Sequence, residues 1–256
     1  MPENPSKREI GERFDAEFAK FKRQHPEATV ATYYTRRHVL KNWALEKGHN
    51  SLGGKIVKQD GEQIEFWEAG RQKAENWIDR YNVAPTAKVV EYGCGTLRLA
   101  AHFIAYLPER HFFGLDVIPE FLEKGRDLIG AELIGEKAPV LAVIDDASIA
   151  AARDFAPDFV FSHAVMHHVH PDELKIYAAN IASIASKPGC RVALNATCHP
   201  TPIRYGNLGW AQPEAQIVEL FRPLEFAGVR KGKAVKRGRF DVQPAAFEFV
   251  RTSTEA

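Results

Sequence analysis

The stretch Lys88–Thr96, KVVEYGCGT, decides the fold that we expect for this chain. Val89 and Val90 are apolar and β-branched, and Gly93 and Gly95 follow them closely, so the segment predicts a buried strand that ends in a tight turn. Glycines allow the backbone to approach a ligand closely, because they carry no side chain and tolerate positive φ.

The residues after this turn predict a helix. Apolar side chains recur at helical spacing from Leu97 to Leu107, Thr96 is a suitable N-cap, and Pro108 ends the pattern. The start of such a helix offers free N–H groups to a ligand. Strand, glycine turn and helix together are half of a nucleotide-binding βαβ unit.

Two further residues limit the kind of nucleotide. Asp116 ends the next predicted strand, HFFGLDV, roughly 20 residues past the glycines, where such folds hold an acid against ribose hydroxyls. Arg98 stands where a dinucleotide-binding fingerprint has its third glycine. The arginine argues against a pyrophosphate cofactor and favours a ligand that has a ribose and no phosphates.

Five motifs together resemble one known family. ExGxGT at 91–96 and GLDV at 114–117 are followed by IDDAS at 144–148, PDFVFSHAVMHH at 157–168 and KPGCRVALNAT at 187–197. The first two are similar to motifs I and II of class I S-adenosylmethionine-dependent methyltransferases. The other three resemble the adenine-binding motif, the fourth strand with its exit loop, and the fifth strand of that family. The motifs are specific for the cofactor and say little about the substrate.

The expected fold is α/β. Strands and helices alternate from Pro85 onward, which implies a Rossmann-like, mostly parallel sheet with helices on both faces. Near the end, QIVELFRPLEFAG at 216–228 predicts a helix, and residues 229–252 predict the antiparallel pair that closes a methyltransferase sheet. We predict two domains: an N-terminal helical cap over the substrate at 1–84, and the S-adenosylmethionine-binding methyltransferase domain at 85–256.

The cap is predicted to contain two helices. Ile10–Phe21 has an apolar stripe among charges, which serves either for packing or for binding a partner. Glu62–Tyr81 has a second stripe, and in related methyltransferases the helix at this place lies over the cofactor. The resemblance therefore implies that Arg71 faces the methionine carboxylate, with a solvated arginine as the alternative.

The resemblance also implies roles for the acidic residues. Glu91 would lie near the methionine ammonium, Asp116 would accept hydrogen bonds from the ribose, and Asp146 or its neighbour Asp145 would accept one from the adenine amine. The complete set of predicted cofactor-binding residues is Arg71, Glu91, Gly93, Gly95, Asp116, Val117, Asp145, Asp146, Ala147 and His163.

A group of histidines follows the fourth predicted strand, where a substrate would meet the transferred methyl group: His163, His167, His168 and His170. Three interpretations stay open, namely a general base, a metal site, or local packing and hydrogen bonding. We prefer His167 as the catalytic base, with His199 second, and we predict no metal site. His199 belongs to TCHPTPIRYGNLGW at 197–210, which we expect to be a long loop without regular structure that could line an acceptor pocket.

The composition excludes several classes of protein. The 256 residues carry 34 basic and 33 acidic side chains, so no overall field attracts nucleic acid. No stretch approaches the roughly 20 apolar residues of a membrane span, and we expect a cytoplasmic protein without a membrane partner. The three cysteines share no CxxC spacing, which indicates neither a disulfide framework nor a zinc site.

We therefore expect a methyltransferase, a transferase of the EC 2.1.1 class, that uses S-adenosyl-L-methionine and methylates an oxygen or nitrogen of a small-molecule acceptor. RNA or protein acceptors are the nearer alternative. A nicotinamide-dependent oxidoreductase and a non-catalytic binding module are the alternatives from other classes. The sequence leaves the oligomeric state open, a homodimer included.

Overall fold

The computed structural model describes residues 7–34, 56–57, 63–64, 66–206 and 209–253. The helices of these ranges are α1 (Lys7–Gln24), α2 (Val30–Tyr34), α4 (Phe66–Arg80), α5 (Ala100–Tyr106), α6 (Pro119–Ile129), α7 (Ala131–Lys137), α8 (Asp146–Asp154), α9 (Leu174–Ile184) and α10 (Glu214–Leu220), with short 3₁₀ turns η3 (Met166–His168) and η4 (Pro171–Glu173). The strands are β1 (Ile56–Val57), β2 (Gln63–Ile64), β3 (Val89–Tyr92), β4 (Phe112–Asp116), β5 (Val140–Val143), β6 (Phe159–Ser162), β7 (Arg191–Cys198), β8 (Ile203–Gly206), β9 (Gly209–Ala211), β10 (Glu225–Lys231), β11 (Val235–Arg237) and β12 (Phe240–Val250).

A single large sheet forms the centre of the molecule. Its strand order is β10-β12-β7-β6-β3-β4-β5, and β11 adds to β12. The pairs from β5 to β7 are parallel, whereas β12 runs antiparallel to both β7 and β10. The prediction of a mostly parallel α/β sheet closed by an antiparallel strand is confirmed.

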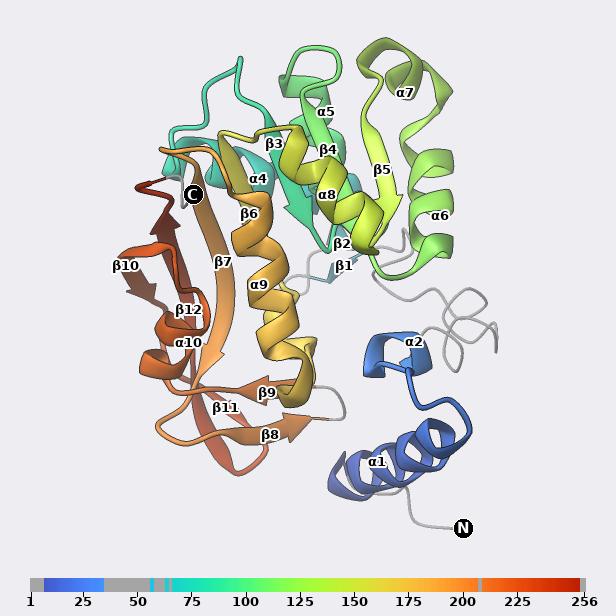
Figure 1. Cartoon of the computed structure of the whole chain (residues 1–256), viewed down its shortest axis with the longest axis vertical. Helices are drawn as coiled ribbons and strands as arrows, with labels where there is room; N and C mark the ends of the chain where they lie inside the picture. The colour runs from blue at the N-terminus through green and yellow to red at the C-terminus, as the bar shows by residue number, and fades with distance from the viewer. Residues whose placement is uncertain (1–6, 35–55, 58–62, 65, 207–208, 254–256) are drawn as a thin grey trace.

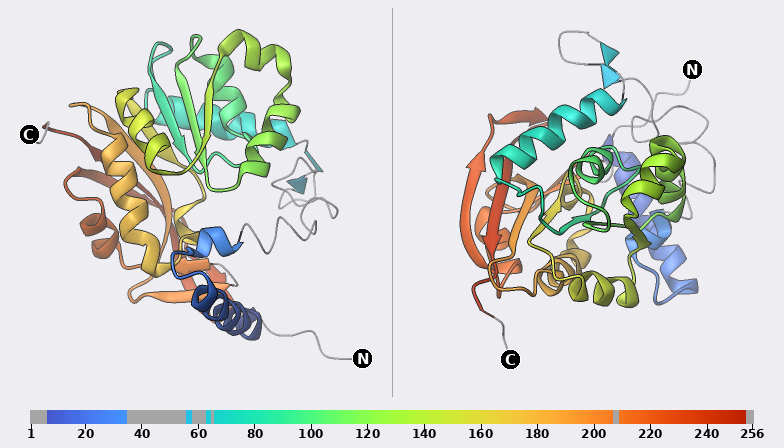
Figure 2. Two further views of the ribbon diagram at one scale, coloured as in Figure 1. Left: turned by 45° about the vertical axis from the view of Figure 1, so that its right-hand side comes forward. Right: turned by 90° about the horizontal axis from the view of Figure 1, so that it is seen from above.

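Helices cover both faces of this sheet, as Figures 1 and 2 show. On one face, α8, α9 and α10 bury a cluster that includes Val90, Val160, Ile181 and Phe247. On the other face, α4 and α5 bury a second cluster that includes Trp77 and Phe161. The parallel strands β3, β4 and β6 are therefore buried on both faces, in keeping with their almost continuous apolar residues, whereas the edge strand β5 is partly exposed.

The glycine turn leads into its helix later than expected. Leu97 has φ of 63°, a left-handed conformation that an α-helix cannot contain, and the helix α5 begins only at Ala100. Thr96 is consequently not its N-cap. Leu97 is completely buried, and a side chain at Gly125 of α6 would bring a Cβ within 2.6 Å of its Cγ. The absence of a side chain at Gly125 therefore lets α6 pack against the turn.

Two predictions in the C-terminal half were wrong. The expected loop 197–210 contains β8, which pairs with β9 as a hairpin. The expected helix 216–228 ends at Leu220, and β10 begins at Glu225. Pro223 explains the break, because proline has no N–H to continue the helix and disfavours helical conformation in the residue before it.

The N-terminal helices divide into two groups. Phe14, Val30 and Tyr33 of α1 and α2 form a separate small cluster, to which Phe18 and Phe21 add. In contrast, α4 belongs to the cluster that supports the sheet. Figure 1 shows α1 and α2 beyond the carboxyl ends of the parallel strands, near β8 and β9. The part of the predicted cap between residues 35 and 55 lies outside the described residues.

Contacts from distant segments hold α1 and α2 in this position. Asp15 of α1 forms an ion pair with Arg204 of β8, and the backbone N–H of Val30 donates to the carboxylate of Glu173 in η4. The ring of Phe18 lies 6.5 Å from that of His170. Among the described helices, none is long and apolar enough to cross a membrane.

Candidate cofactor and acceptor site

Most of the predicted site residues lie at or just beyond the carboxyl ends of the five parallel strands. β3 leads to the glycine turn, β4 to Asp116 and Val117, β5 to Asp145, β6 to His163, and β7 to His199. Ligands of open parallel sheets bind at this edge, on either side of the point where the strand order reverses. Here that point is β3, whose neighbours are β4 and β6.

Asp116 ties the glycine turn to the end of β4. Its Oδ2 accepts a hydrogen bond from the N–H of Gly95 at 2.7 Å, and its Oδ1 accepts one from Ile118 at 3.0 Å. Burial raises the pKa of this carboxyl to about 6, although the amide hydrogen bonds act in the opposite direction. The second lone pair of each oxygen can accept from a further donor.

The turn itself leaves room for a ligand. A Cβ added at Gly95 would meet no atom within 4 Å among the described residues, whereas one at Gly93 would lie 2.3 Å from a methyl of Val165. Gly93 is therefore needed for packing against the loop after β6. Gly95, with φ of 55°, is open on its outer side.

Glu91 is a buried carboxyl without a complete set of partners. It is 3% exposed, and within the described ranges its Oε2 has no hydrogen-bond partner. Burial raises its pKa well above the ordinary value, the nearby charge of Asp116 adds to this, and Arg98 acts in the opposite direction. An unpaired buried carboxyl is costly, so this atom is suited to a cationic donor that a ligand would bring.

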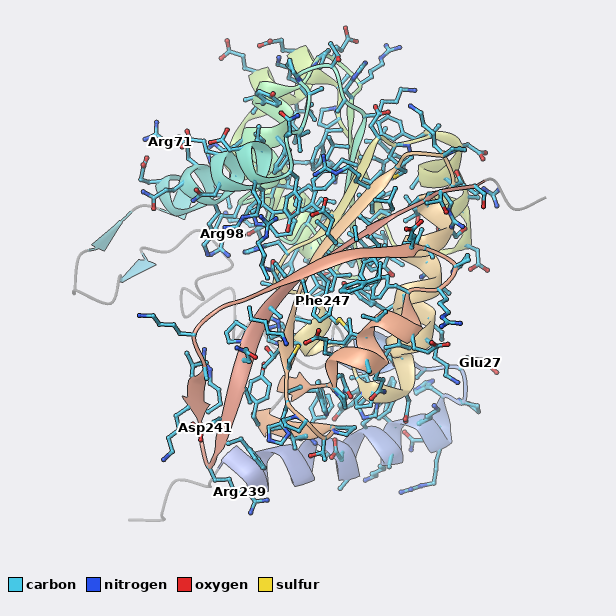
Figure 3. The ribbon with its side chains drawn as sticks, turned by 90° about the vertical axis from the view of Figure 1, so that its left-hand side faces the viewer. Glu27, Arg71, Arg98, Arg239, Asp241 and Phe247 are labelled. Atoms are coloured by element: carbon cyan, nitrogen blue, oxygen red, sulfur yellow. The ribbon has the colours of Figure 1, made fainter. Side chains whose placement is uncertain are left out.

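Arg71 and Arg98 lie on opposite sides of α4 (Figure 3). Arg71 is 54% exposed and forms an ion pair with Glu68 at 2.5 Å, so its contact with a carboxylate of a ligand stays a prediction. Arg98 lies towards the sheet, near Glu91, and α4 can approach its backbone because residue 70 is glycine. The sequence singled out Arg98 only as a departure from a fingerprint, and it did not indicate this position under α4.

The residues after β5 are more exposed. Asp145 caps α8: its Oδ1 accepts from the N–H of Ser148 at 2.7 Å, which lowers its pKa. Asp146 is the first residue of α8 and, like Ala147, is exposed. Val117, at the end of the neighbouring strand, is 40% exposed. An apolar valine beside an exposed carboxylate suits a flat base with a polar edge.

The four histidines after β6 are not equivalent. His163 bonds to Asn195 of β7 at 2.8 Å, and burial lowers its pKa to about 4. Burial also lowers the pKa of His167 to about 3, and its ring centroid lies 4.0 Å from that of the exposed His168. His170 caps η4 and contacts Trp210 at 5.4 Å. No cluster of three or more potential metal ligands occurs in the part of the chain that the structure describes.

His199 is held by its own loop. Its Nδ1 lies 2.8 Å from the carbonyl oxygen of Thr201, and its ring lies 5.8 Å from that of Phe240. Nearby, the hydroxyl groups of Thr197 and Tyr205 form a hydrogen bond with an oxygen–oxygen distance of 3.1 Å. The carboxyl end of β7 thus offers hydroxyl groups as well as His199.

Comparison with known proteins agrees with this geometry. Residues 90–192 match a family model described as a methyltransferase domain. No curated protein sequence matches the chain.

Solved structures share the fold at low sequence identity. Magnesium protoporphyrin IX methyltransferase from Synechocystis PCC 6803, with bound SAM, is 16% identical over 86% of this chain and 94% of its own, with a TM-score of 0.56. The [4+2]-cyclase SpnF is 14% identical over 87% of this chain and 96% of its own, with a TM-score of 0.60. Geranyl diphosphate C-methyltransferase from Streptomyces coelicolor A3(2) is 14% identical over 71% of this chain and 79% of its own, with a TM-score of 0.53.

Proposed function

We propose that this chain, which carries a methyltransferase domain, is an S-adenosylmethionine-dependent methyltransferase that methylates an oxygen or nitrogen of a small molecule. The observation that carries this proposal is the buried, unpaired Oε2 of Glu91 beside the open turn at Gly95. A cofactor with an ammonium group and a ribose would bring a hydrogen-bond donor to Glu91 and to Asp116. S-adenosylmethionine supplies the activated methyl group when it is bound.

Different residues of the site would bind different parts of the cofactor. Glu91 would receive the ammonium, Asp116 the ribose hydroxyls, and Val117 with Asp146 and Ala147 the adenine. Methyl transfer is an in-line displacement, so the chain mainly has to align the acceptor and exclude water. His167 lies on the exit loop of β6 and is our candidate for taking a proton from the acceptor.

Two acidic side chains offset part of the positive charge of the last strands. Lys231 pairs with Glu214 at 2.6 Å, and Arg230 lies 4.0 Å from the carboxylate of Glu248. These two contacts reduce the attraction of β10 for a polyanion such as RNA. The three free cysteines, all buried, are in keeping with the cytoplasmic location that we also propose.

Replacing Asp116 with alanine should weaken binding of S-adenosylmethionine by about 1–3 kcal/mol, or roughly 5- to 150-fold, because the ribose loses a charge-assisted acceptor. Titration calorimetry on both proteins measures this change. Asp154→Ala, which removes an exposed carboxylate at the far end of α8, is the matched control and should bind as the wild type does. Wild-type protein that ignores S-adenosylmethionine but binds a nicotinamide dinucleotide would refute the proposal.

Binding of the cofactor should also release a proton from Glu91. Burial raises the pKa of this carboxyl in the free protein and an ammonium beside it lowers the pKa, so binding releases a proton at any pH between the two pKa values. Calorimetry at a series of pH values in buffers of different ionisation enthalpy should therefore give heats that depend on the buffer in that pH range. Glu91→Gln should remove this dependence. Identical heats in all buffers for the wild type would contradict this role of Glu91.

A further inference from the structure

Three polar side chains, those of Glu91, His163 and Asn195, lie on the face of the sheet that α4 covers. Glu91 is in register with Phe161 of β6, and Phe161 is in register with Ala193 of β7. Residues paired in register point to the same face, and so do residues two apart on a strand. Asn195 of β7 therefore lies on the face of Glu91. His163 comes directly after β6 and lies on the same face, because it contacts Asn195 and the ring of Trp77, which also contacts Phe161.

The hydrogen bond between His163 and Asn195 determines where the imidazole carries its proton. The Oδ1 atom of Asn195 can only accept, so the Nδ1 atom of His163, 2.8 Å away, must be the donor. A neutral imidazole with its proton on Nδ1 has a lone pair on Nε2. Because Asn195 occupies Nδ1, Nε2 is the ring nitrogen that can accept from a ligand.

The surroundings of His163 keep the ring neutral and fixed. Its pKa is lowered to about 4 chiefly by burial, and the positive charges of Lys73 and Arg98 act in the same direction. The indole of Trp77 meets the ring edge to face, with centroids 5.4 Å apart. The charge of Arg98 acts on the pKa of both Glu91 and His163, which belong to β3 and to the end of the neighbouring strand β6.

We propose that Asn195 is a positioning residue that holds His163 as the Nδ1–H tautomer, so that Nε2 accepts a hydrogen bond from the cofactor's ammonium group. The inference rests on the proposed function, since it assigns a second partner to the cofactor's ammonium group, which we place beside Glu91. The side-chain oxygen at 195 suits this task, because it accepts from Nδ1 and so fixes the proton on that nitrogen. An imidazolium at 163 would offer the ammonium only donors and would repel it.

The first test is the tautomer of His163 in the ligand-free protein, read from the nitrogen chemical shifts in NMR spectra of ¹⁵N-labelled histidine. The wild type should show Nδ1–H. Asn195→Leu removes the acceptor at similar size, and the proton should then move to Nε2. Asn195→Asp keeps an acceptor oxygen and should preserve Nδ1–H. Asn180→Leu, the same substitution on α9, should leave His163 unchanged.

The second test is ligand affinity by calorimetry. Asn195→Leu should bind S-adenosylmethionine and S-adenosylhomocysteine roughly 10- to 100-fold more weakly, because a hydrogen bond to a charged group is lost. 5′-Methylthioadenosine has no amino-acid end, so its affinity should not change. Asn195→Asp should bind all three ligands at least as tightly as the wild type.

These measurements separate positioning from a merely structural role. An equal loss of affinity for methylthioadenosine, or a persistent Nδ1–H signal in Asn195→Leu, overturns the inference. If Asn195→Leu does not fold, loss of the Nδ1–H signal or of cofactor binding in the folded Asn195→Asp protein also overturns it. Failure of the wild type to bind S-adenosylmethionine defeats the proposed function instead, and the tautomer measurement does not depend on that result.

Discussion

Replacing His167 with alanine is expected to lower turnover by roughly 10²–10⁴-fold if the acceptor is a hydroxyl, since this is the usual contribution of a positioned general base. The oxygen becomes a better nucleophile as its proton leaves. His167 follows β6 in η3, and burial lowers its pKa to about 3, so the ring is neutral at physiological pH but a weaker base than a solvated imidazole. An amine acceptor that is already neutral needs this help less.

The control for this experiment is His168→Ala. His168 is exposed and packs against the ring of His167, so its loss should change the melting temperature more than the turnover. Turnover, cofactor affinity and melting temperature should be measured for both variants once screening of hydroxylated and amine compounds identifies an acceptor. Near-native turnover of the His167→Ala enzyme would show that His167 is not the general base, and His199 would be the next residue to replace.

Removal of residues 1–60 is expected to abolish turnover while cofactor affinity changes little. The helices α1 and α2 pack around their own cluster, so the two clusters that support the sheet remain intact without them. They lie beyond the carboxyl ends of the strands, near His170 and Trp210, where they would cover the acceptor and exclude water. A truncated protein with full turnover on the same acceptor would show that these helices are no cap.

A point variant tests the same idea within the full chain. Tyr33 contacts Phe14, Phe18 and Phe21 with ring centroids between 5.2 and 5.5 Å apart, so Tyr33→Ala should loosen the cap and raise the KM for the acceptor. Tyr106→Ala on α5 is the matched control, because this tyrosine is partly exposed and bonds to Val83 away from the site. Cofactor affinity should stay constant in both variants.

The strands of the sheet and the glycine turn could be predicted because their signals are local. Short apolar runs mark β3 to β7, and Gly93 and Gly95 mark the end of β3, without reference to any other part of the chain. The helix start at Ala100 and the β8–β9 hairpin were missed. A left-handed backbone at Leu97 and a pairing between Ile203 and Ala211 depend on what packs around them.

The sequence alone determined the class of fold, the edge of the sheet where a ligand is expected, and most of the candidate residues along it, because the strand pattern and the glycine spacing are carried by consecutive residues. Only the tertiary structure decided which side chains meet there. It turned Arg71 to solvent and Arg98 towards Glu91, and it joined His163 to Asn195, which lies 32 residues further along the chain. Burial and hydrogen bonding set the charge of each group, and both depend on strands and helices that come together only when the chain folds.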